Sequence, residues 1–252
     1  MYGCPLLRVR EMSDPRLAII ERRFVNVRSV IAVSSGKGGV GKSVTATCLA
    51  LSLENQGYSV GLLDLDFTSP ATHVILGAER LYPEEEYGII PPLVYGLRYM
   101  SIIYYSLDEP APLRGEDVSN AIIELLAITR WEKLDYLVVD MPPGIGDATL
   151  DTIRLIPKLS FIVVTTPSKV AYQSVRRMMV LLKKLDIPII GVFENMVMRH
   201  SDYVQSDVEE MGIKYLGSVE YDEYLESALG DISKLKNTRF YEKVEELSSR
   251  VL

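Results

Sequence analysis

Seven short runs of aliphatic and β-branched residues recur along the chain. Most of them are apolar at successive positions rather than at alternate ones, which is typical of strands buried between two layers of helices. The predicted strands cover residues 27–35, 59–66, 97–105, 134–142, 160–167, 187–195 and 213–219. The pattern therefore predicts a sheet that is covered on both of its faces.

The segments between these runs carry apolar residues at helical spacing, three and four positions apart. The predicted helices include residues 46–56, 119–129, 148–156 and 174–185. Strands that alternate with helices form right-handed crossovers and a parallel sheet. We therefore expect an α/β fold with a doubly wound, mostly parallel sheet that is flanked by helices. No linker or repeat interrupts the alternation, so residues 1–252 are expected to form a single domain.

Two segments stand outside this alternation. Residues 79–96 are rich in Pro, Gly and Glu, and we expect a surface excursion there. Near the C-terminus, Phe240, Val244, Leu247 and Val251 share one face of a predicted amphipathic helix. The polar face of this helix carries glutamates, whereas helices on membrane surfaces favour Lys and Arg. The helix is therefore expected to pack against the protein core.

The charge balance narrows the range of partners. The chain has 34 acidic and 27 basic residues, which gives a net charge of −7. Proteins that bind nucleic acids are usually basic, so no nucleic-acid partner is expected. No apolar run approaches the roughly 18 residues needed to span a bilayer, and the first residues lack the pattern of a signal peptide. We therefore expect a cytoplasmic protein without a membrane partner.

Residues 36–43 read GKGGVGKS and match the phosphate-binding pattern G-x-x-x-x-G-K-[ST]. Between a predicted strand and a predicted helix, such a loop surrounds phosphates with backbone N–H groups, and the helix adds its positive end. Lys42 would supply a charge to the β- and γ-phosphates of ATP, and Ser43 would offer its hydroxyl to Mg²⁺. The predicted nucleotide contacts in this stretch are Gly36, Lys37, Gly38, Gly39, Val40, Gly41, Lys42, Ser43 and Val44.

A site for a Mg²⁺-nucleotide also needs carboxylates at the ends of strands. Asp140 ends the apolar run LDYLVVD, where it would hold a Mg²⁺-bound water as a Walker B aspartate does. Asp64 and Asp66 end another strand, GLLDLD. We favour Asp66 as the residue that orients the attacking water, because it lies further out along the strand. Asp66 is thus a candidate for both catalysis and the metal site.

The loop MPPGIGD, residues 141–147, directly follows the predicted Walker B strand. Its two prolines stiffen the loop, and Gly144 and Gly146 permit a change of conformation. This composition favours a switch segment that senses the γ-phosphate, with Gly144 near the nucleotide. Asp147 either belongs to the switch or caps the following helix.

The phosphate-binding loop has a second lysine, Lys37, besides the one that the pattern requires. Within one subunit, the backbone and Lys42 already cover the phosphates. Lys37 could therefore point away from its own nucleotide and stabilise charge on the phosphate transferred in another subunit. This interpretation predicts a catalytic role for Lys37 in an ATP-dependent homodimer.

With these residues, the chain resembles the superclass of MinD, ParA and the nitrogenase iron protein, whose deviant Walker A motif reads K-G-G-x-G-K-[ST]. Within that superclass it is most similar to the Mrp/Nbp35 (ApbC-type) family. The matching stretches are SVIAVSSGKGGVGKS, GLLDLDFTSPATHVILG, PLRGEDVSNAI, LDYLVVDMPPGIGDATL and VTTPSKVAYQSVRRMMVLLKKLDIPIIGVFENM. The resemblance runs from residue 27 to residue 230.

The resemblance implies a fold and several roles. It implies a P-loop NTPase fold and a homodimeric switch that hydrolyses ATP slowly and is stimulated by a protein partner. By the same resemblance, Lys37 reaches across the dimer and Asn195 contacts the adenine base. It further implies a role in carrying or assembling iron–sulfur clusters.

The cysteines depart from the family pattern. Members of the family usually carry C-x-x-C shortly after the ENM stretch, whereas this chain reads ENMVMRHSDYVQ. Its two cysteines are Cys4, near the first residue, and Cys48, which we expect to be buried. His73 and His200 have no partners at the spacing of metal ligands, and we expect both at the surface. An iron–sulfur cluster is thus suggested by the family but is not supported by the cysteines.

Two other classes of function compete with this hypothesis. A spatial organiser of the MinD or ParA kind would act through ATP-dependent binding to a partner or surface. A MinD relative would be expected to end in a basic membrane helix, and a ParA relative to carry a basic surface for DNA. A small-molecule kinase or ligase would need a second substrate signature, which the sequence does not show.

Overall fold

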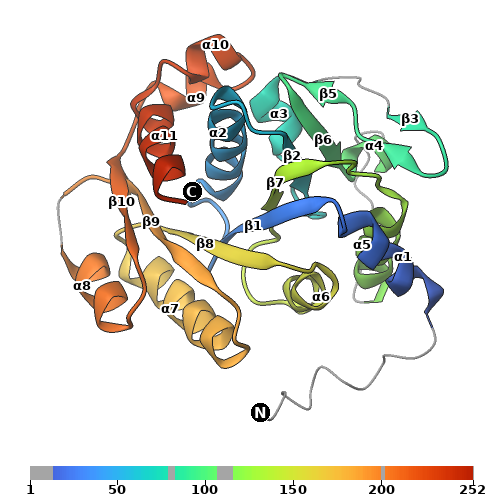
Figure 1. Ribbon diagram of the computed structural model, residues 1–252. Helices are drawn as coiled ribbons and strands as arrows, with labels where there is room; N and C mark the ends of the chain where they lie inside the picture. Colours follow the sequence, from blue (N-terminus) through green and yellow to red (C-terminus); the bar gives the residue numbers. More distant parts are fainter. Residues whose placement is uncertain (1–13, 79–82, 107–115, 200–201, 252) are drawn as a thin grey trace.

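The computed structural model describes residues 14–78, 83–106, 116–199 and 202–251. Its main sheet has eight strands in the order β10-β9-β8-β1-β7-β2-β6-β5 (Figure 1). All neighbours pair in parallel except β5, which runs antiparallel to β6 at one edge. The strands are β1 (Val27–Ser35), β2 (Val60–Asp64), β5 (Leu93–Val94), β6 (Leu97–Ser101), β7 (Leu134–Asp140), β8 (Leu159–Thr165), β9 (Ile189–Val197) and β10 (Tyr215–Glu220).

Helices cover both faces of this sheet, as Figure 1 shows. One face is covered by α2 (Lys42–Asn55), α3 (Thr72–Leu76), α9 (Leu225–Ala228), α10 (Ile232–Leu235) and α11 (Arg239–Val251). The other is covered by α1 (Pro15–Phe24), α5 (Glu116–Ile128), α6 (Asp147–Leu155), α7 (Lys169–Lys184) and α8 (Tyr203–Glu210). The predicted doubly wound, mostly parallel α/β fold is therefore confirmed.

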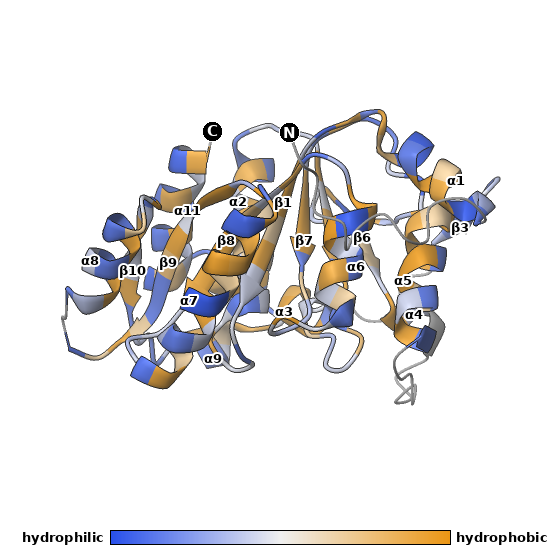
Figure 2. Ribbon diagram, turned by 90° about the horizontal axis from the view of Figure 1, so that it is seen from below, coloured by the Kyte–Doolittle hydropathy of each residue, from blue (hydrophilic) through white to orange (hydrophobic). Residues whose placement is uncertain are grey.

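The core consists of two apolar clusters, one on each face of the sheet. Successive residues of β1 alternate between them, so that Val30 and Ala32 face one cluster while Ile31 and Val33 face the other. Because both faces are buried, the strands carry apolar residues at successive positions along most of their length. Figure 2 accordingly shows the central strands coloured mostly hydrophobic, between helices that carry both colours.

The structure differs from the predicted elements at several places. The predicted strand 97–105 ends at Ser101, and the four-residue helix α4 (Ile103–Ser106) follows it. Within the predicted surface excursion, β3 (Glu84–Glu85) and β4 (Ile89–Ile90) form a small hairpin. Helices α1 and α8 were not predicted, although Asp14 caps α1 and Pro15 begins it.

The predicted C-terminal helix is present as α11 and packs against the core. Phe240, Val244 and Leu247 are buried on one face of it, and Val251 packs against the same cluster. Ser248 joins α11 to α2 through a hydrogen bond with Ser52, with 2.9 Å between the hydroxyl oxygens. The amphipathic pattern therefore reflects packing on α2, as expected.

Parallel pairing brings the carboxyl ends of the central strands to one edge of the sheet. In the register of β1 and β7, Val33 is the partner of Asp140, and in the register of β2 and β7, Asp64 is the partner of the same residue. The N–H of Leu65 donates to the carbonyl of Asp140 at 2.9 Å. The loops that follow these three strands are thus adjacent, as in other sites of open α/β sheets.

Candidate active site

The phosphate-binding loop, residues 36–41, connects β1 to the start of α2 at Lys42. Gly41 precedes the helix with a φ of 87°, and no side chain caps the helix there. The N–H groups of the first turn are therefore left for a ligand, as they are in anion sites. A Cβ at Gly41 would collide with the side-chain amide of Asn195. Both the left-handed backbone and this close approach require glycine.

The first glycine of the loop has a different constraint. A Cβ at Gly36 would lie 2.6 Å from the Cβ of Ser174 and 2.6 Å from the backbone nitrogen of Val175. The beginning of the loop therefore packs directly on the backbone of α7. Ser35 stabilises the same turn, because its hydroxyl donates to the carbonyl of Lys37 at 2.9 Å.

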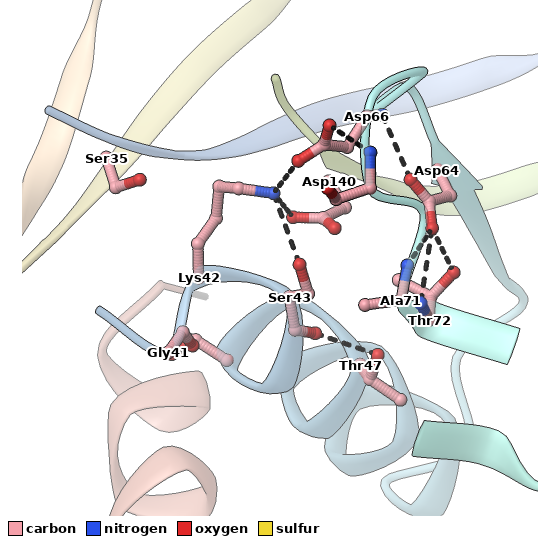
Figure 3. A network of polar contacts seen from close by, with 12 residues as sticks. Ser35, Gly41, Lys42, Ser43, Thr47, Asp64, Asp66, Ala71, Thr72 and Asp140 are labelled. Carbon is pink, nitrogen blue, oxygen red and sulfur yellow. Dashed lines mark hydrogen bonds and ion pairs between the residues drawn. The ribbon is translucent and has the colours of Figure 1, made fainter. Parts of the chain in front are cut away.

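Lys42 extends from the first turn of α2 into a buried group of oxygens, as Figure 3 shows. Its ammonium nitrogen lies 2.6 Å from Oδ1 of Asp140 and 3.6 Å from Oδ2 of Asp66. It also donates to the hydroxyl of Ser43 at 3.2 Å. The structure thus brings together the four side chains that the sequence analysis chose for phosphate and metal binding.

Asp140 ends β7 and is wholly buried. Its Oδ1 accepts the bond from Lys42, while its Oδ2 has no hydrogen-bond partner among the described residues. Burial raises the pKa of Asp140 to about 7, although Lys42 lowers it. A buried carboxylate oxygen without a partner needs an explanation. Beside the Ser43 hydroxyl, it fits a hard cation such as Mg²⁺, which prefers oxygen ligands and retains bound waters.

Asp64 and Asp66 follow each other closely but have different environments. Oδ1 of Asp66 accepts bonds from the N–H and the hydroxyl of Thr68, at 3.3 and 2.7 Å, and from the N–H of Ser69 at 3.1 Å. Its other oxygen faces Lys42. The carboxylate of Asp64 instead faces Ala71 and Thr72 (Figure 3). This arrangement supports the choice of Asp66 over Asp64 as the residue that faces a nucleotide.

The loop after β7 is tied to the start of the phosphate-binding loop. The N–H of Gly144 donates to the carbonyl of Ser35 at 2.8 Å, and the hydroxyl of Thr149 donates to the carbonyl of Gly144 at 3.1 Å. Asp147 does not cap α6, because Gly146 occupies the cap position without a side-chain bond. The capping alternative for Asp147 is therefore wrong, and the residue is exposed at the start of the helix.

Asn195, at the end of β9, holds the phosphate-binding loop in this structure. Its side-chain nitrogen donates to the carbonyl of Val40 at 2.9 Å, and its side-chain oxygen accepts from the N–H of Met196 at 2.8 Å. Met196 adopts a left-handed conformation with a φ of 58°, which is uncommon for a residue with a side chain. Asn195 thus lies beside the loop, and its contact with adenine remains a prediction.

Lys37 is exposed and forms no ion pair with any residue in the described ranges. It lines a surface cavity of about 680 Å³ together with residues of its own loop, of β9 and of the loops after β8 and β9. These residues are Gly39, Val40, Thr166, Pro167, Ser168, Met196, Met198 and Arg199. The two lysines of the loop therefore have opposite environments, because Lys42 is buried among carboxylates and Lys37 faces solvent.

The remaining candidates for metal ligands do not assemble into a site. Cys48 is a free thiol in the core of α2, as expected, and burial raises its pKa. Cys4 and His200 lie outside the described residues. His73 was expected at the surface but is half-buried on α3, where its Nδ1 has no described partner. Within the described ranges, no three His, Cys, Asp or Glu side chains are grouped to hold a metal.

A glycine-rich loop between β1 and α2, with a lysine, a serine and two strand-end aspartates around it, defines a P-loop NTPase. Comparison with known sequences gives the family. The profile of the ParA-type NUBPL iron-transfer P-loop NTPases matches residues 26–248, and the chain belongs to this family.

The iron–sulfur cluster carrier protein of Escherichia coli strain K12 is 44% identical over 173 residues. The match covers 68% of this chain and 47% of that protein, so the chain spans about half the length of this curated relative. A nucleotide-binding protein from Archaeoglobus fulgidus, solved with ADP, has a TM-score of 0.74 and 27% identity, covering 87% of this chain and 92% of that chain.

The cell division ATPase MinD of Pyrococcus furiosus shares the fold, with a TM-score of 0.63 at 19% identity, over 89% of this chain and 98% of that chain. In the part of the chain that the structure describes, no helix is long and apolar enough to cross a membrane.

Proposed function

We propose that this protein binds ATP together with Mg²⁺ and hydrolyses it. The observation that carries this proposal is the convergence of Ser43, Asp66 and Asp140 on the buried ammonium of Lys42. The second carboxylate oxygen of Asp140 is buried there without a described partner. These are the side-chain types that hold a Mg²⁺-nucleotide in P-loop enzymes.

Each residue has a chemical role in the proposed reaction. The N–H groups at the start of α2 bind the phosphates, and Lys42 leaves Asp140 to contact the β- and γ-phosphates. Ser43 and Asp140 would hold Mg²⁺, the latter through water. When bound, Mg²⁺ neutralises charge on the phosphates. Asp66, fixed by Thr68 and Ser69, orients the attacking water with its remaining oxygen.

A second copy of the chain would complete the site. Lys37 is not used by the site of its own subunit and is exposed. Met198, which lines the same cavity, is 84% exposed. Val170 is 73% exposed in the first turn of α7, two residues after Ser168 of that cavity. Exposed apolar groups rimmed by charge are typical of interaction surfaces. We therefore infer an ATP-dependent homodimer in which Lys37 of each subunit contacts the nucleotide of the other.

The proposed pathway is iron–sulfur cluster assembly, because the chain belongs to the iron-transfer family. The cluster itself would not be held by thiolates of the described residues, since Cys48 is buried and Cys4 is the only other cysteine. Clusters are usually held by four thiolates. The chain would then act on a partner protein that holds the cluster.

The second candidate is a binding switch of the MinD or ParA kind, which uses Mg²⁺-ATP but does not carry an iron–sulfur cluster. It is favoured by the exposed apolar side chains around Lys37, and the fold is compatible with it. In this case the ATP-bound dimer would bind a partner or a surface directly. Co-sedimentation with liposomes or DNA in the presence of ATP would support this candidate.

Two experiments test the proposal. Lys42→Ala should weaken ATP binding by about 100-fold or more, and wild-type protein should release phosphate from ATP only when Mg²⁺ is present. Anaerobic reconstitution with iron and sulfide, followed by an iron count, then tests whether the chain itself holds a cluster. Iron near four atoms per dimer would show that the chain itself holds a cluster, with Cys4 the first ligand to replace, whereas no retained iron favours a switch that acts on a partner.

A further inference from the structure

Asp64 lies beside the active site but faces away from Lys42. It is the register partner of Asp140, yet Figure 3 shows its carboxylate directed toward the start of α3. Its Oδ1 accepts from the N–H of Asp66 at 3.0 Å. Its Oδ2 accepts from the N–H groups of Ala71 and Thr72, both at 3.2 Å, and from the hydroxyl of Thr72 at 2.7 Å. One carboxylate thus receives four hydrogen bonds.

The direction of the hydrogen bonds follows from the donors available. An ionised carboxylate only accepts hydrogen bonds, and the four donors leave no described acceptor for a carboxyl proton on Asp64. The single hydroxyl proton of Thr72 is therefore directed to Asp64. The hydroxyl of Tyr99 lies 2.9 Å from that of Thr72 and must donate to it. The bonds run in one direction, from Tyr99 through Thr72 to Asp64.

Tyr99 anchors this chain of bonds in the core. It is wholly buried on β6, and its ring packs edge-on against Tyr104 with 5.8 Å between the ring centroids. Burial raises the pKa of Tyr99, so the phenol keeps its proton. The donor end of the chain is therefore rigid and independent of any nucleotide.

Asp64, at the acceptor end of this chain of hydrogen bonds, holds the segment that carries Asp66. Residues 66–71 begin and end on the same carboxylate, because Asp64 binds the N–H of Asp66 and the N–H of Ala71. Within this closed segment, Thr68 and Ser69 fix one oxygen of Asp66 and leave the other facing Lys42 at 3.6 Å. Burying a charge is costly. The carboxylate of Asp64 is buried at the point where it closes the segment that carries Asp66.

We propose that Asp64, Thr72 and Tyr99 are positioning residues for hydrolysis, which hold Asp66 opposite Lys42 through one directed chain of hydrogen bonds. The inference rests on the proposed function, because it assigns Asp66 to the attacking water. None of the three residues is among the proposed nucleotide contacts. Their loss should therefore slow turnover and leave nucleotide binding nearly unchanged.

The test replaces the central hydroxyl at constant volume. Thr72→Val removes both side-chain bonds of residue 72, Thr72→Ser keeps them, and Tyr99→Phe removes only the last donor. The control is Thr129→Val, since Thr129 is equally buried just after α5, and the one side-chain hydrogen bond found for it among the described residues goes to the carbonyl of Leu125. Two quantities are measured, steady-state ATP hydrolysis and amide hydrogen exchange of residues 66–72.

We expect Thr72→Val to lower kcat about tenfold and to speed exchange of the 66–72 amides by a similar factor, the scale of the lost hydrogen bond to Asp64. KM and ATP affinity should stay within about threefold. Tyr99→Phe should act in the same direction and less strongly. Thr72→Ser and Thr129→Val should behave like the wild-type protein.

Any one of four results would overturn the positioning role. Unchanged exchange in Thr72→Val would show that the bonds do not hold the segment, whatever the turnover. Equal losses in kcat and in ATP affinity, or the same losses in Thr129→Val, would show a purely structural role. No hydrolysis by the wild-type protein would refute the proposed function, and the positioning role with it. The exchange data distinguish that outcome from one in which the hydrogen bonds fail to hold residues 66–72.

Discussion

The two sides of the phosphate-binding loop are built in opposite ways. On the side of β2 and β7, Lys42, Asp66 and Asp140 are buried, with the Lys42 ammonium within 3.6 Å of both carboxylates. On the side of β8 and β9, Lys37 and Met198 are exposed around a cavity of about 680 Å³. The first side is complete within one chain, whereas the second presents a charge and apolar groups without partners in the described structure.

This difference suggests that the two sides of the loop have different roles, one in nucleotide binding and hydrolysis and the other in dimer formation. A buried cluster of charges is stable only when its members are paired, and the first side satisfies this condition before any nucleotide arrives. An exposed lysine among apolar side chains becomes useful when another surface covers it. Variants on the two sides should therefore fail in different ways, the first in nucleotide binding and chemistry, the second in assembly.

The largest expected effect belongs to Lys42, which contacts both phosphates in the proposed complex. A charge-assisted hydrogen bond contributes about 1.5–3 kcal/mol, so Lys42→Ala should weaken ATP affinity by about 100-fold or more. Titration with a fluorescent ATP analogue measures this affinity. Wild-type ATP affinity in this variant would contradict the proposed role of Lys42 in phosphate binding.

Lys37→Ala should leave ATP affinity of the monomer intact but lower kcat by about 1000-fold, the scale of a charged finger supplied by a partner. Its dimer should also fail to form with ATP. Turnover and sedimentation, measured on the same sample, check both effects. Full turnover with a normal dimer would remove the proposed role of Lys37 in trans.

Asp66→Asn should bind ATP and hydrolyse it about 100-fold more slowly, as for the loss of a general base or water-orienting group. The amide has the size of the carboxylate, so the segment 66–71 should keep its shape. Single-turnover hydrolysis and ATP affinity, measured on the same variant, separate the effect on the reaction from the effect on binding. If the variant hydrolysed ATP at the wild-type rate, Asp66 would not be the residue that orients the attacking water.

Val170→Asp should weaken the ATP-dependent dimer by about tenfold, because a charge replaces an apolar group of the proposed interface. The substitution lies in the first turn of α7, where an acidic residue favours the helix. Val25→Asp is the matched control, since Val25 is 67% exposed and follows α1 far from the loop. Equal dimer affinity in both variants would place the interface elsewhere.

The sequence was sufficient for the parts of the site that a short motif dictates. GKGGVGKS between a strand and a helix located Lys42 and Ser43, and the apolar strand that ends in Asp140 located the carboxylate beside them. Both follow from local patterns, since a parallel sheet brings the ends of its strands together. The fold class followed from the same alternation of strands and helices.

Other features depend on contacts between distant segments and have no local signal. The bond between Thr72 and Tyr99 joins α3 to β6, and nothing in either stretch indicates it. The environment of Asn195 depends equally on the approach of β9 to the phosphate-binding loop. The early end of the strand at Ser101 was missed because apolar residues continue into a short helix.

The most direct test of the division between the two sides is the oligomeric state of Asp66→Asn, which should hold ATP without rapid hydrolysis. Sedimentation velocity would be measured with Mg²⁺-ATP and with Mg²⁺-ADP. Both measurements would be repeated on the double variant that also carries Lys37→Ala. The account predicts a dimer with ATP, a monomer with ADP, and a monomer under both conditions once Lys37 is replaced. A monomer with saturating ATP, or a dimer that ignores both the nucleotide and Lys37, would contradict it.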